Sequence, residues 1–386
     1  MTKVQMLQGK ELVIGVTGSI AAVEVVKLIH EFRRKGAGVQ VVMSQAATGI
    51  IHPDGLAYAS ARPVITRLSG MVEHVTSCGD RGNADLLLIA PCTANTLGKI
   101  AHGIDDTPVT TFATTALGSG IPVLVVPAMH HSMYRHPAVL ENIKRLKRWG
   151  IGVIEPKIEE GKAKIAAVGE IVLWSERMIL GQPLRGMRVL ITSGSCREPV
   201  DDIRVLTTRS SGQMGRELAL HAFRLGADVT VVHRDAFPCV NNIRAETGQE
   251  MHKQVIRCLS TEGADIYISA AAISDFAPVR VKGKIKSGKA RSIELTPLPK
   301  IIDEVISKFK PLTVAFKLGW DSDRTARDLL NRGAVMVVGN TPDAMGTEKG
   351  IFVLQTNEGT ETIDGSKEEA AIAIWNSLLT LRQAHS

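Results

Sequence analysis

Three short polar segments in the first half of the chain each follow directly on an apolar run. They are residues 15–20 (GVTGSI), 91–96 (PCTANT) and 127–134 (PAMHHSMY). In the first segment Gly18 and Ser19 stand where a strand would turn into a helix, so a phosphate could approach bare N–H groups there. The pattern also suits an ordinary tight turn, because the full G-x-G-x-x-G spacing is absent. Since the carboxyl ends of parallel strands share one edge of a sheet, we expect the three segments on one rim.

Two histidine positions could serve as acid, base or ligand. His74 stands alone between short polar segments, where it suits a surface or packed residue as well as a catalytic base. His130 and His131 follow an apolar run and suit either a solvated turn or a metal site. The metal interpretation is the weaker one, because no Asp, Glu or Cys stands at ligand spacing beside them.

A second set of polar loops begins near residue 192. Residues 207–215 (TTRSSGQMG) open a helical pattern, so Ser210, Ser211 and Gly212 could offer hydroxyls, N–H groups and a helix dipole to a phosphate chain. The spacing does not fit a P-loop. No G-x-G-x-x-G follows the first strand of this half, which disfavours a plain nicotinamide dehydrogenase.

Further along, a carboxylate, several cations and an aromatic ring occur in separate segments. Asp275 follows an apolar run, Lys284 and Lys286 lie in a basic stretch, and Phe316 lies in a later apolar run. Nucleotidyl transfer requires groups of these kinds, because Mg²⁺ and lysine offset the charge of the leaving pyrophosphate.

Strand and helix patterns alternate along the chain and restart once, which predicts two α/β domains at residues 1–183 and 187–386. In the first half we expect strands at 12–16, 39–43, 84–90, 122–127 and 152–154, and helices at 20–34 and 139–149. In the second half we expect strands at 187–192, 227–232, 264–271, 312–318 and 334–338, and helices at 213–225 and 366–382. Repeated β-α-β units favour doubly wound, Rossmann-like parallel sheets. Residues 282–294 favour a hairpin or mobile flap, and residues 351–363 a hairpin.

The composition is that of a globular protein and disfavours several classes. Of the 386 residues 44% are apolar, and no apolar run reaches the roughly 18 residues that span a bilayer. No signal-peptide pattern is present, so we expect a cytoplasmic protein without membrane partners. The net charge of +7 is dispersed, and three Tyr and four Trp offer little base stacking, which disfavours nucleic acid as a partner. Five scattered cysteines without a C-x-x-C pair support neither disulfides nor structural zinc.

Taken in order, GVTGSIAA, the solitary His74, PCTANT and PAMHHSMY resemble the flavin-dependent cysteine decarboxylases that bind FMN. The resemblance implies a flavodoxin-like flavoprotein domain. It also implies six FMN-binding residues, which are Gly18, Ser19, Ser44, Thr93, Asn95 and Thr96. His74 would be the base that helps the flavin oxidise a cysteine thiol, after which the carboxylate is lost.

Two departures from that family's pattern concern the same reaction. In the family's P-x-M-N loop the Asn position is His130 here, so Met129 and His130 are expected to bind substrate, the imidazole donating to a carboxylate. Bacterial members carry a proton-donating cysteine on a flap, but the matching residues 155–164 (EPKIEEGKAK) contain none. The proton is then expected from His130 or from a carboxylic acid of the flap. Archaeal-type members look similar at this point.

The second half resembles the phosphopantothenate–cysteine ligase domain through ITSGSCREPVDDIR, TRSSGQMG, AAISDF, KIKS and SKEEAA. The resemblance implies that CTP activates the carboxylate of 4′-phosphopantothenate for attack by the amine of cysteine. Asp275 would hold Mg²⁺ and Lys284 would be catalytic. Other implied substrate or nucleotide contacts are Ser210, Ser211, Gly212, Ala270, Ala271, Lys286, Pro299, Lys300, Ile301, Ile302 and Phe316. Thr208 and Leu298 stand where that family has Asn.

The two resemblances span the chain and predict a bifunctional enzyme of coenzyme A biosynthesis. It would ligate cysteine to 4′-phosphopantothenate and decarboxylate the product to 4′-phosphopantetheine. Two alternatives stay open, an active ligase with a degenerate flavin domain and a flavin-binding regulatory or scaffold protein. The missing flap cysteine favours the former, and the intact AAISDF and KIKS loops disfavour the latter. The resemblance also implies a homo-oligomer with trimeric flavin domains and dimeric ligase domains.

Overall fold

The chain forms two compact units, Met1–Gly181 and Gln182–Ser386. The computed structural model describes residues 4–159, 162–288, 292–319, 322–341 and 346–384. Within these ranges no helix combines the length and apolar character needed to cross a bilayer.

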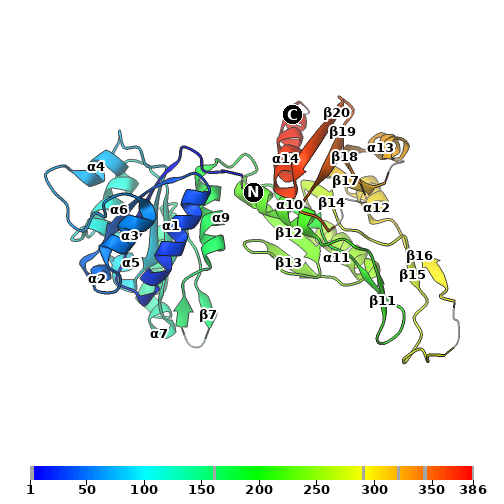
Figure 1. Cartoon of the computed structure of the whole chain (residues 1–386), viewed down its shortest axis with the longest axis horizontal. Helices are drawn as coiled ribbons and strands as arrows, with labels where there is room; N and C mark the ends of the chain where they lie inside the picture. The colour runs from blue at the N-terminus through cyan, green and yellow to red at the C-terminus, as the bar shows by residue number, and fades with distance from the viewer. Residues whose placement is uncertain (1–3, 160–161, 289–291, 320–321, 342–345, 385–386) are drawn as a thin grey trace. The chain divides into compact units, whose positions relative to one another are not determined.

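The first unit is built on a five-stranded sheet in the order β2-β1-β3-β4-β6 (Figure 1). All four strand pairs are parallel. The strands are β1 (Glu11–Val16), β2 (Gly38–Met43), β3 (Leu86–Cys92), β4 (Val123–Pro127) and β6 (Gly152–Val153). Every residue of β3 and β4 is buried, as is typical of parallel strands covered on both faces. The predicted doubly wound architecture of this unit is confirmed.

Two helical layers cover this sheet. One core cluster joins it to α1 (Val25–Arg34), α3 (Pro53–Ser60) and α9 (Val168–Ile179), and the other joins it to α5 (Ala94–Ala101), α6 (Pro108–Gly118) and α8 (Pro137–Arg148). The single helix predicted over residues 20–34 is wrong in one respect. It begins with a separate 3₁₀ turn, η1 (Ile20–Glu24), because the Ser19 hydroxyl accepts from the Ala21 N–H and tightens the first turn.

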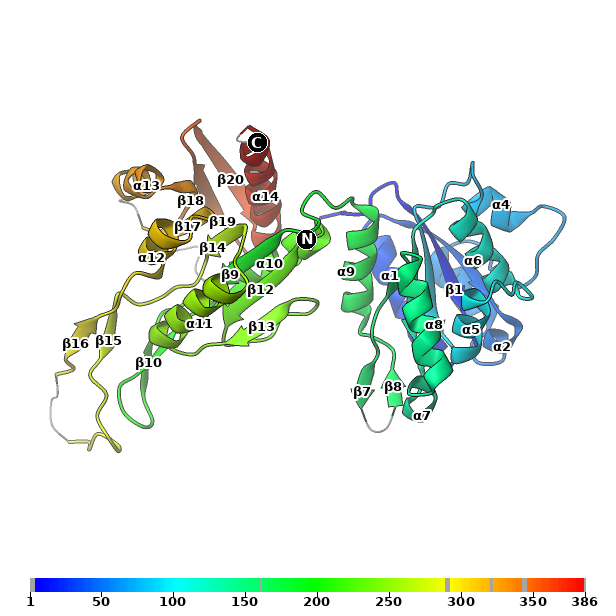
Figure 2. The same ribbon diagram turned by 180° about the vertical axis from the view of Figure 1, so that it is seen from behind.

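The second unit contains an eight-stranded sheet in the order β13-β12-β9-β14-β17-β18-β19-β20 (Figure 2). The strands are β9 (Arg188–Thr192), β12 (Asp228–His233), β13 (Asn241–Arg244), β14 (Ile266–Ser269), β17 (Leu312–Leu318), β18 (Ala334–Asn340), β19 (Lys349–Gln355) and β20 (Thr360–Ser366). Pairing is parallel as far as β18 and antiparallel for β19 and β20. The hairpin predicted at residues 351–363 is therefore confirmed.

The helices of this unit pack in two groups. α10 (Gln213–Arg224) lies against α14 (Lys367–Ala384), where the buried indole of Trp375 donates to the Leu218 carbonyl at 3.0 Å. α11 (Gly248–Thr261) and α12 (Ile301–Lys308) share a core cluster with Leu190 of β9 and Tyr267 of β14. α13 (Ser322–Asn331) precedes β18.

Two small hairpins stand apart from the large sheet of the second unit (Figures 1 and 2). One pairs β10 (Arg197–Pro199) with β11 (Val205–Thr207), and the other pairs β15 (Phe276–Pro278) with β16 (Leu295–Pro297). The described part of the predicted flap at 282–294 connects β15 to β16 and contains no strand of its own before β16. Glycines in the left-handed region at Gly283 and Gly288 favour a loop there.

Candidate functional site

A cavity of about 420 Å³ opens in the first unit at the carboxyl ends of β1 and β3, where the strand order changes direction. Its lining includes all six residues predicted to bind FMN, which are Gly18, Ser19, Ser44, Thr93, Asn95 and Thr96. Met129, from the third polar segment, also lines it. The prediction that the three polar segments share one rim is confirmed.

The hydroxyl of Thr17 joins the polar segment at residues 15–20 to the one at residues 91–96. The Oγ1 of Thr17 donates to the Pro91 carbonyl at 2.7 Å and accepts from the Thr93 N–H at 3.0 Å. Thr93 in turn caps α5, its hydroxyl accepting from the Thr96 N–H at 3.3 Å. The loops after β1 and β3 therefore hold one another in place, and the hydroxyls of Ser19 and Ser44 and the amide of Asn95 are not used in these bonds.

Two features of the cavity suit a phosphorylated flavin. A Cβ placed on Gly18 would lie 2.6 Å from the Cβ of Ala46, so the backbone there approaches its neighbour more closely than any side chain allows. The hydroxyl of Ser44 is buried and has no hydrogen-bond partner in the described part of the protein. An orphaned buried hydroxyl beside a cavity is expected to bond a ligand. Phosphate oxygens are acceptors of the kind this rim requires.

His74 does not line this cavity. It lies on α4 (Glu73–Cys78), with its ring edge-on to Phe112 at 6.3 Å between centroids. Its buried Nδ1 has no hydrogen-bond partner among the described residues. The predicted base and the predicted flavin-binding residues are thus not brought together within one chain.

His130 lies beside the flap at residues 155–164. β5 (Met129–His130) pairs with β8 (Lys162–Lys164), which pairs with β7 (Lys157–Glu159), and His130 stands opposite Lys162. Met129 faces the cavity, whereas His130 is exposed. Residues 160 and 161 of the predicted flap lie outside the described residues.

Glu155, at the start of the flap, is an ionised and fully partnered carboxylate. The Lys147 ammonium donates to it at 2.6 Å, and the hydroxyl of Tyr134 on α7 (His131–Tyr134) donates to its other oxygen. Burial raises the pKa of the Glu155 carboxyl, but these two hydrogen bonds outweigh burial and hold the pKa below its ordinary value. Of the flap acids, Glu155 is therefore poorly suited to donate a proton.

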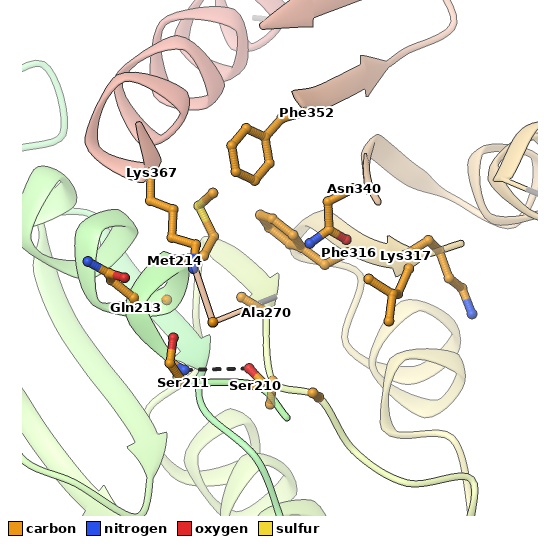
Figure 3. A pocket seen from close by; sticks show the side chains of 16 residues that line it. Ser210, Ser211, Gln213, Met214, Ala270, Phe316, Lys317, Asn340, Phe352 and Lys367 are labelled. Carbon is orange, nitrogen blue, oxygen red and sulfur yellow. Dashed lines mark hydrogen bonds between the residues drawn. The ribbon is translucent and has the colours of Figure 1, made fainter. Parts of the chain in front are cut away.

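The second unit has a cavity of about 120 Å³ between the start of α10, the ends of β14, β17 and β18, and the start of α14 (Figure 3). Its lining includes six of the predicted contacts, which are Ser210, Ser211, Gly212, Ala270, Ala271 and Phe316. The phosphate-type loop and the aromatic ring are therefore brought together.

Seven other predicted residues do not line this cavity, namely Asp275, Lys284, Lys286, Pro299, Lys300, Ile301 and Ile302. Ile301 is 3% exposed and belongs to the hydrophobic core, which leaves little of its side chain for a ligand. Asp275 is exposed and adjoins the segment before α12, since the Leu298 N–H donates to the Asp275 carbonyl at 2.8 Å. Asp275 therefore lies beside the segment that leads to Pro299, Lys300 and the start of α12.

The loop that carries Lys284 and Lys286 is anchored by two acids of the β10–β11 connection. Asp201 accepts from the Ile285 N–H at 3.0 Å, and Asp202 accepts from the Gly283 N–H at 3.0 Å. Both lysine side chains are exposed. The backbone of the loop is therefore held while its ammonium groups stay available.

Mg²⁺ could be held at Asp275 only together with a ligand. Among the residues that the structure describes, no group of three or more His, Cys, Asp or Glu side chains could cage a metal. Mg²⁺ commonly binds through one or two carboxylates plus substrate phosphates and water. The exposed carboxylate of Asp275 fits that mode.

The chain is similar along nearly its whole length to known proteins. Residues 1–179 match the family described as Flavoprotein, and residues 184–381 match the DNA/pantothenate metabolism flavoprotein C-terminal domain. The chain is 44% identical over 394 residues to the Coenzyme A biosynthesis bifunctional protein CoaBC of Thermococcus kodakarensis, covering 98% of this chain and 96% of that protein. It is 33% identical over 385 residues to the protein of the same name from Methanocaldococcus jannaschii, covering 95% and 93%. The chain belongs to the family of Coenzyme A biosynthesis bifunctional proteins CoaBC.

A solved C-terminal domain of a Coenzyme A biosynthesis bifunctional protein CoaBC is 28% identical, covers 53% of this chain and 99% of its own, and has a TM-score of 0.44. Family membership confirms the predicted bifunctional enzyme of coenzyme A biosynthesis, with decarboxylase and ligase activities. The first unit of this bifunctional protein is a flavoprotein domain.

The lining of the second cavity also includes Asn340, Phe352 and Lys367, which the sequence analysis does not predict as site residues. Asn340 ends β18, Phe352 lies in the antiparallel β19, and Lys367 begins α14. Lys367 belongs to the motif SKEEAA, but a lysine at the start of a helix gives no sign in the sequence that its side chain is buried.

Proposed function

We propose that the second unit forms 4′-phosphopantothenoylcysteine from 4′-phosphopantothenate, cysteine and CTP, and that the first unit decarboxylates it with FMN. The observation that carries the flavin assignment is the cavity of the first unit, in which Gly18 leaves no room for a Cβ and the hydroxyl of Ser44 has no partner among the described residues. A βα rim of this kind suits the phosphate of a flavin mononucleotide. Charged phosphorylated substrates do not cross a bilayer unaided, so we assign both reactions to the cytoplasm.

In the first unit we assign the flavin phosphate to Gly18, Ser19 and Ser44, with the loop after β3 contributing Thr93, Asn95 and Thr96. Bound FMN supplies the oxidation of the cysteine thiol on which loss of the carboxylate depends. His74 takes the thiol proton. His130 donates a hydrogen bond to the substrate carboxylate and then returns a proton, a role for which the ionised carboxylate of Glu155 is poorly suited.

We further propose that His74 reaches the cavity of another copy of the chain, within a trimer of first units. His74 does not line its own cavity, which supports this assignment. Ile20, next to Ser19, is 77% exposed, and Met71, three residues before His74, is 76% exposed. Apolar side chains exposed to this extent beside a site are suited to an interface.

In the second unit we propose that dimers form through the two small hairpins. Their exposed apolar residues, here called the apolar arm, are Ile203, Val205, Leu206, Phe276, Val279, Val281, Ile293 and Leu295. Asp275 would hold Mg²⁺ against the nucleotide phosphates, and Lys284 and Lys286 would offset the charge of the leaving pyrophosphate. Phe316 would contact the nucleotide, and Ser210 to Gly212 the phosphorylated substrate. The amine of cysteine then attacks the activated carboxylate.

Purified protein should be yellow, and heat release should yield FMN rather than FAD. Incubation with 4′-phosphopantothenate, cysteine, Mg²⁺ and CTP should release pyrophosphate. A colourless protein that cannot be loaded with FMN would contradict the assignment of the first unit. Lack of pyrophosphate with both CTP and ATP would contradict that of the second.

A further inference from the structure

Lys367 is a buried cation at the edge of the second cavity. It is 6% exposed and is the first residue of α14. Its backbone is fixed on both sides, because its N–H donates to the Glu348 carbonyl at 3.1 Å and the hydroxyl of Ser366 accepts from the Glu369 N–H at 3.2 Å. The side chain reaches from the start of α14 toward Met214 at the start of α10 (Figure 3).

No described residue pairs with this ammonium. The described residues that line the cavity include no Asp or Glu, and the Lys317 side chain extends away from Lys367 in the same view. Burial lowers the pKa of the Lys367 ammonium. A buried charge without a partner is costly to fold, so a site that keeps one is expected to obtain its counter-charge from a ligand.

The first turn of α10 lies across the cavity from Lys367. This helix has 12 residues, and no side chain caps its N-terminus. Gly212 is the N-cap of the helix and has φ +74°. A Cβ on Gly215 would lie 2.3 Å from the Ser193 hydroxyl, so the start of the helix packs closely against the loop after β9. Residues 212–215 line the cavity, so the N–H groups of this first turn, which have no partner within the helix, lie at the cavity wall with the positive end of the helix dipole.

We propose that Lys367 and the N-terminal turn of α10 together bind a phosphoryl group of a ligand of the second unit. The identity of that ligand rests on the proposed function, whereas the anion site does not. Two sources share the chemistry, the phosphate monoester of 4′-phosphopantothenate and the polyphosphate of the nucleotide. Lys367 neutralises the anion from the α14 side, and the N–H groups of α10 bond its oxygens.

The test is calorimetric titration of the full chain with 4′-phosphopantothenate, pantothenate, CTP, cytidine and inorganic pyrophosphate. Lys367→Met and Lys367→Gln are compared with wild type and with Lys253→Met, which removes an exposed lysine of α11. Loss of one charge-assisted contact should lower the affinity for the phosphorylated ligand about 10- to 100-fold and leave the affinity for its dephosphorylated counterpart unchanged. The ligand-free variants should unfold at or above the wild-type temperature, because an unpaired buried charge has been removed.

Selective loss of 4′-phosphopantothenate affinity identifies the monoester as the source, and selective loss of CTP and pyrophosphate affinity identifies the nucleotide. Affinities for all three phosphorylated ligands within twofold of wild type would overturn the proposal. If wild type binds pyrophosphate through Lys367 but forms no ligated product, the proposed function fails and the anion site stands.

Discussion

The carboxylate of Asp201 accepts a hydrogen bond from the backbone N–H of Ile285 at 3.0 Å. The same carboxylate accepts from the N–H of Ile203 at 2.8 Å and from the N–H and guanidinium of Arg204, both at 2.6 Å. One buried acid thereby joins the β10–β11 hairpin to the residue between Lys284 and Lys286. The lysines that we assign to the leaving pyrophosphate are positioned through this acid.

Replacing Asp201 should slow ligation and leave flavin binding unchanged. Asp201→Asn removes the negative charge that accepts hydrogen bonds from the Ile285 N–H and the Arg204 guanidinium. The loop that carries Lys284 and Lys286 is then held less tightly. We expect kcat/KM for CTP in pyrophosphate release to fall by about tenfold. Asp364→Asn, on the exposed face of β20, is the matched control and should be silent. Equal rates of pyrophosphate release for both variants would contradict the claim that Asp201 positions Lys284 and Lys286.

The same acid predicts how stability depends on pH. The hydrogen bond from the Ile285 N–H lowers the pKa of the Asp201 carboxyl, and the N–H groups of Arg204 and Ile203 lower it further. Burial raises this pKa, but the hydrogen bonds outweigh burial and hold it well below its ordinary value. A lowered folded-state pKa gives stability that is complete above the ordinary Asp pKa of about 3.9 and is lost as the pH falls below it. The protection factors for hydrogen exchange at residues 283–286, which correct for the intrinsic pH dependence of exchange, should therefore stay high near neutrality and fall in acid. In Asp201→Asn they should be low throughout, and an unchanged acid transition in that variant would argue against this cause.

Gly18→Ala should abolish or severely weaken flavin binding. Its Cβ would lie 2.6 Å from the Cβ of Ala46, so α2 (Gln45–Thr48), which carries Ala46, would have to move. Gly49→Ala is a close control, because its Cβ would be 3.8 Å from the nearest atom and its φ is −79°. Flavin content after purification and fluorescence titration with FMN measure the effect. Stoichiometric FMN in Gly18→Ala would contradict the placement of the phosphate.

Removing Mg²⁺ should separate the two reactions. With EDTA, pyrophosphate release should stop. No cage of three or more ligating side chains is found among the described residues, so Mg²⁺ at Asp275 would be held weakly and would be removed by the chelator. Without Mg²⁺ the carboxylate of Asp275 would repel the nucleotide phosphates. Release of CO₂ from preformed 4′-phosphopantothenoylcysteine should continue. Loss of that activity in EDTA would mean that a metal also serves the first unit.

The flavin rim could be predicted from the sequence because each of its polar segments directly follows a buried parallel strand. Once Gly18 and Thr93 were placed after β1 and β3, the strand order brought them to one edge. No comparable rule placed His74, because α4 is short and its contact with Phe112 depends on tertiary packing. The sequence therefore supplied the identity of this histidine and not its position.

The second cavity was only partly predictable for the same reason. Ser210 and Ala270 follow patterns local to one loop, whereas Phe352 and Lys367 reach the cavity from an antiparallel strand and a helix that follow β18. α9 is one of several helices that were not predicted; buried Glu176 interrupts its apolar stripe, and the ion pair of Glu176 with Lys35 at 3.4 Å joins residues far apart in sequence. Charged groups that become buried are hidden from periodicity alone.

The central claim is that one chain performs both reactions, and carboxyl-labelled cysteine tests it most directly. With 4′-phosphopantothenate, CTP and Mg²⁺, wild-type protein loaded with FMN should release labelled CO₂ and pyrophosphate in equal amounts. His74→Asn should release pyrophosphate at the wild-type rate and no labelled CO₂. Pyrophosphate without labelled CO₂ from the wild-type protein would contradict the claim.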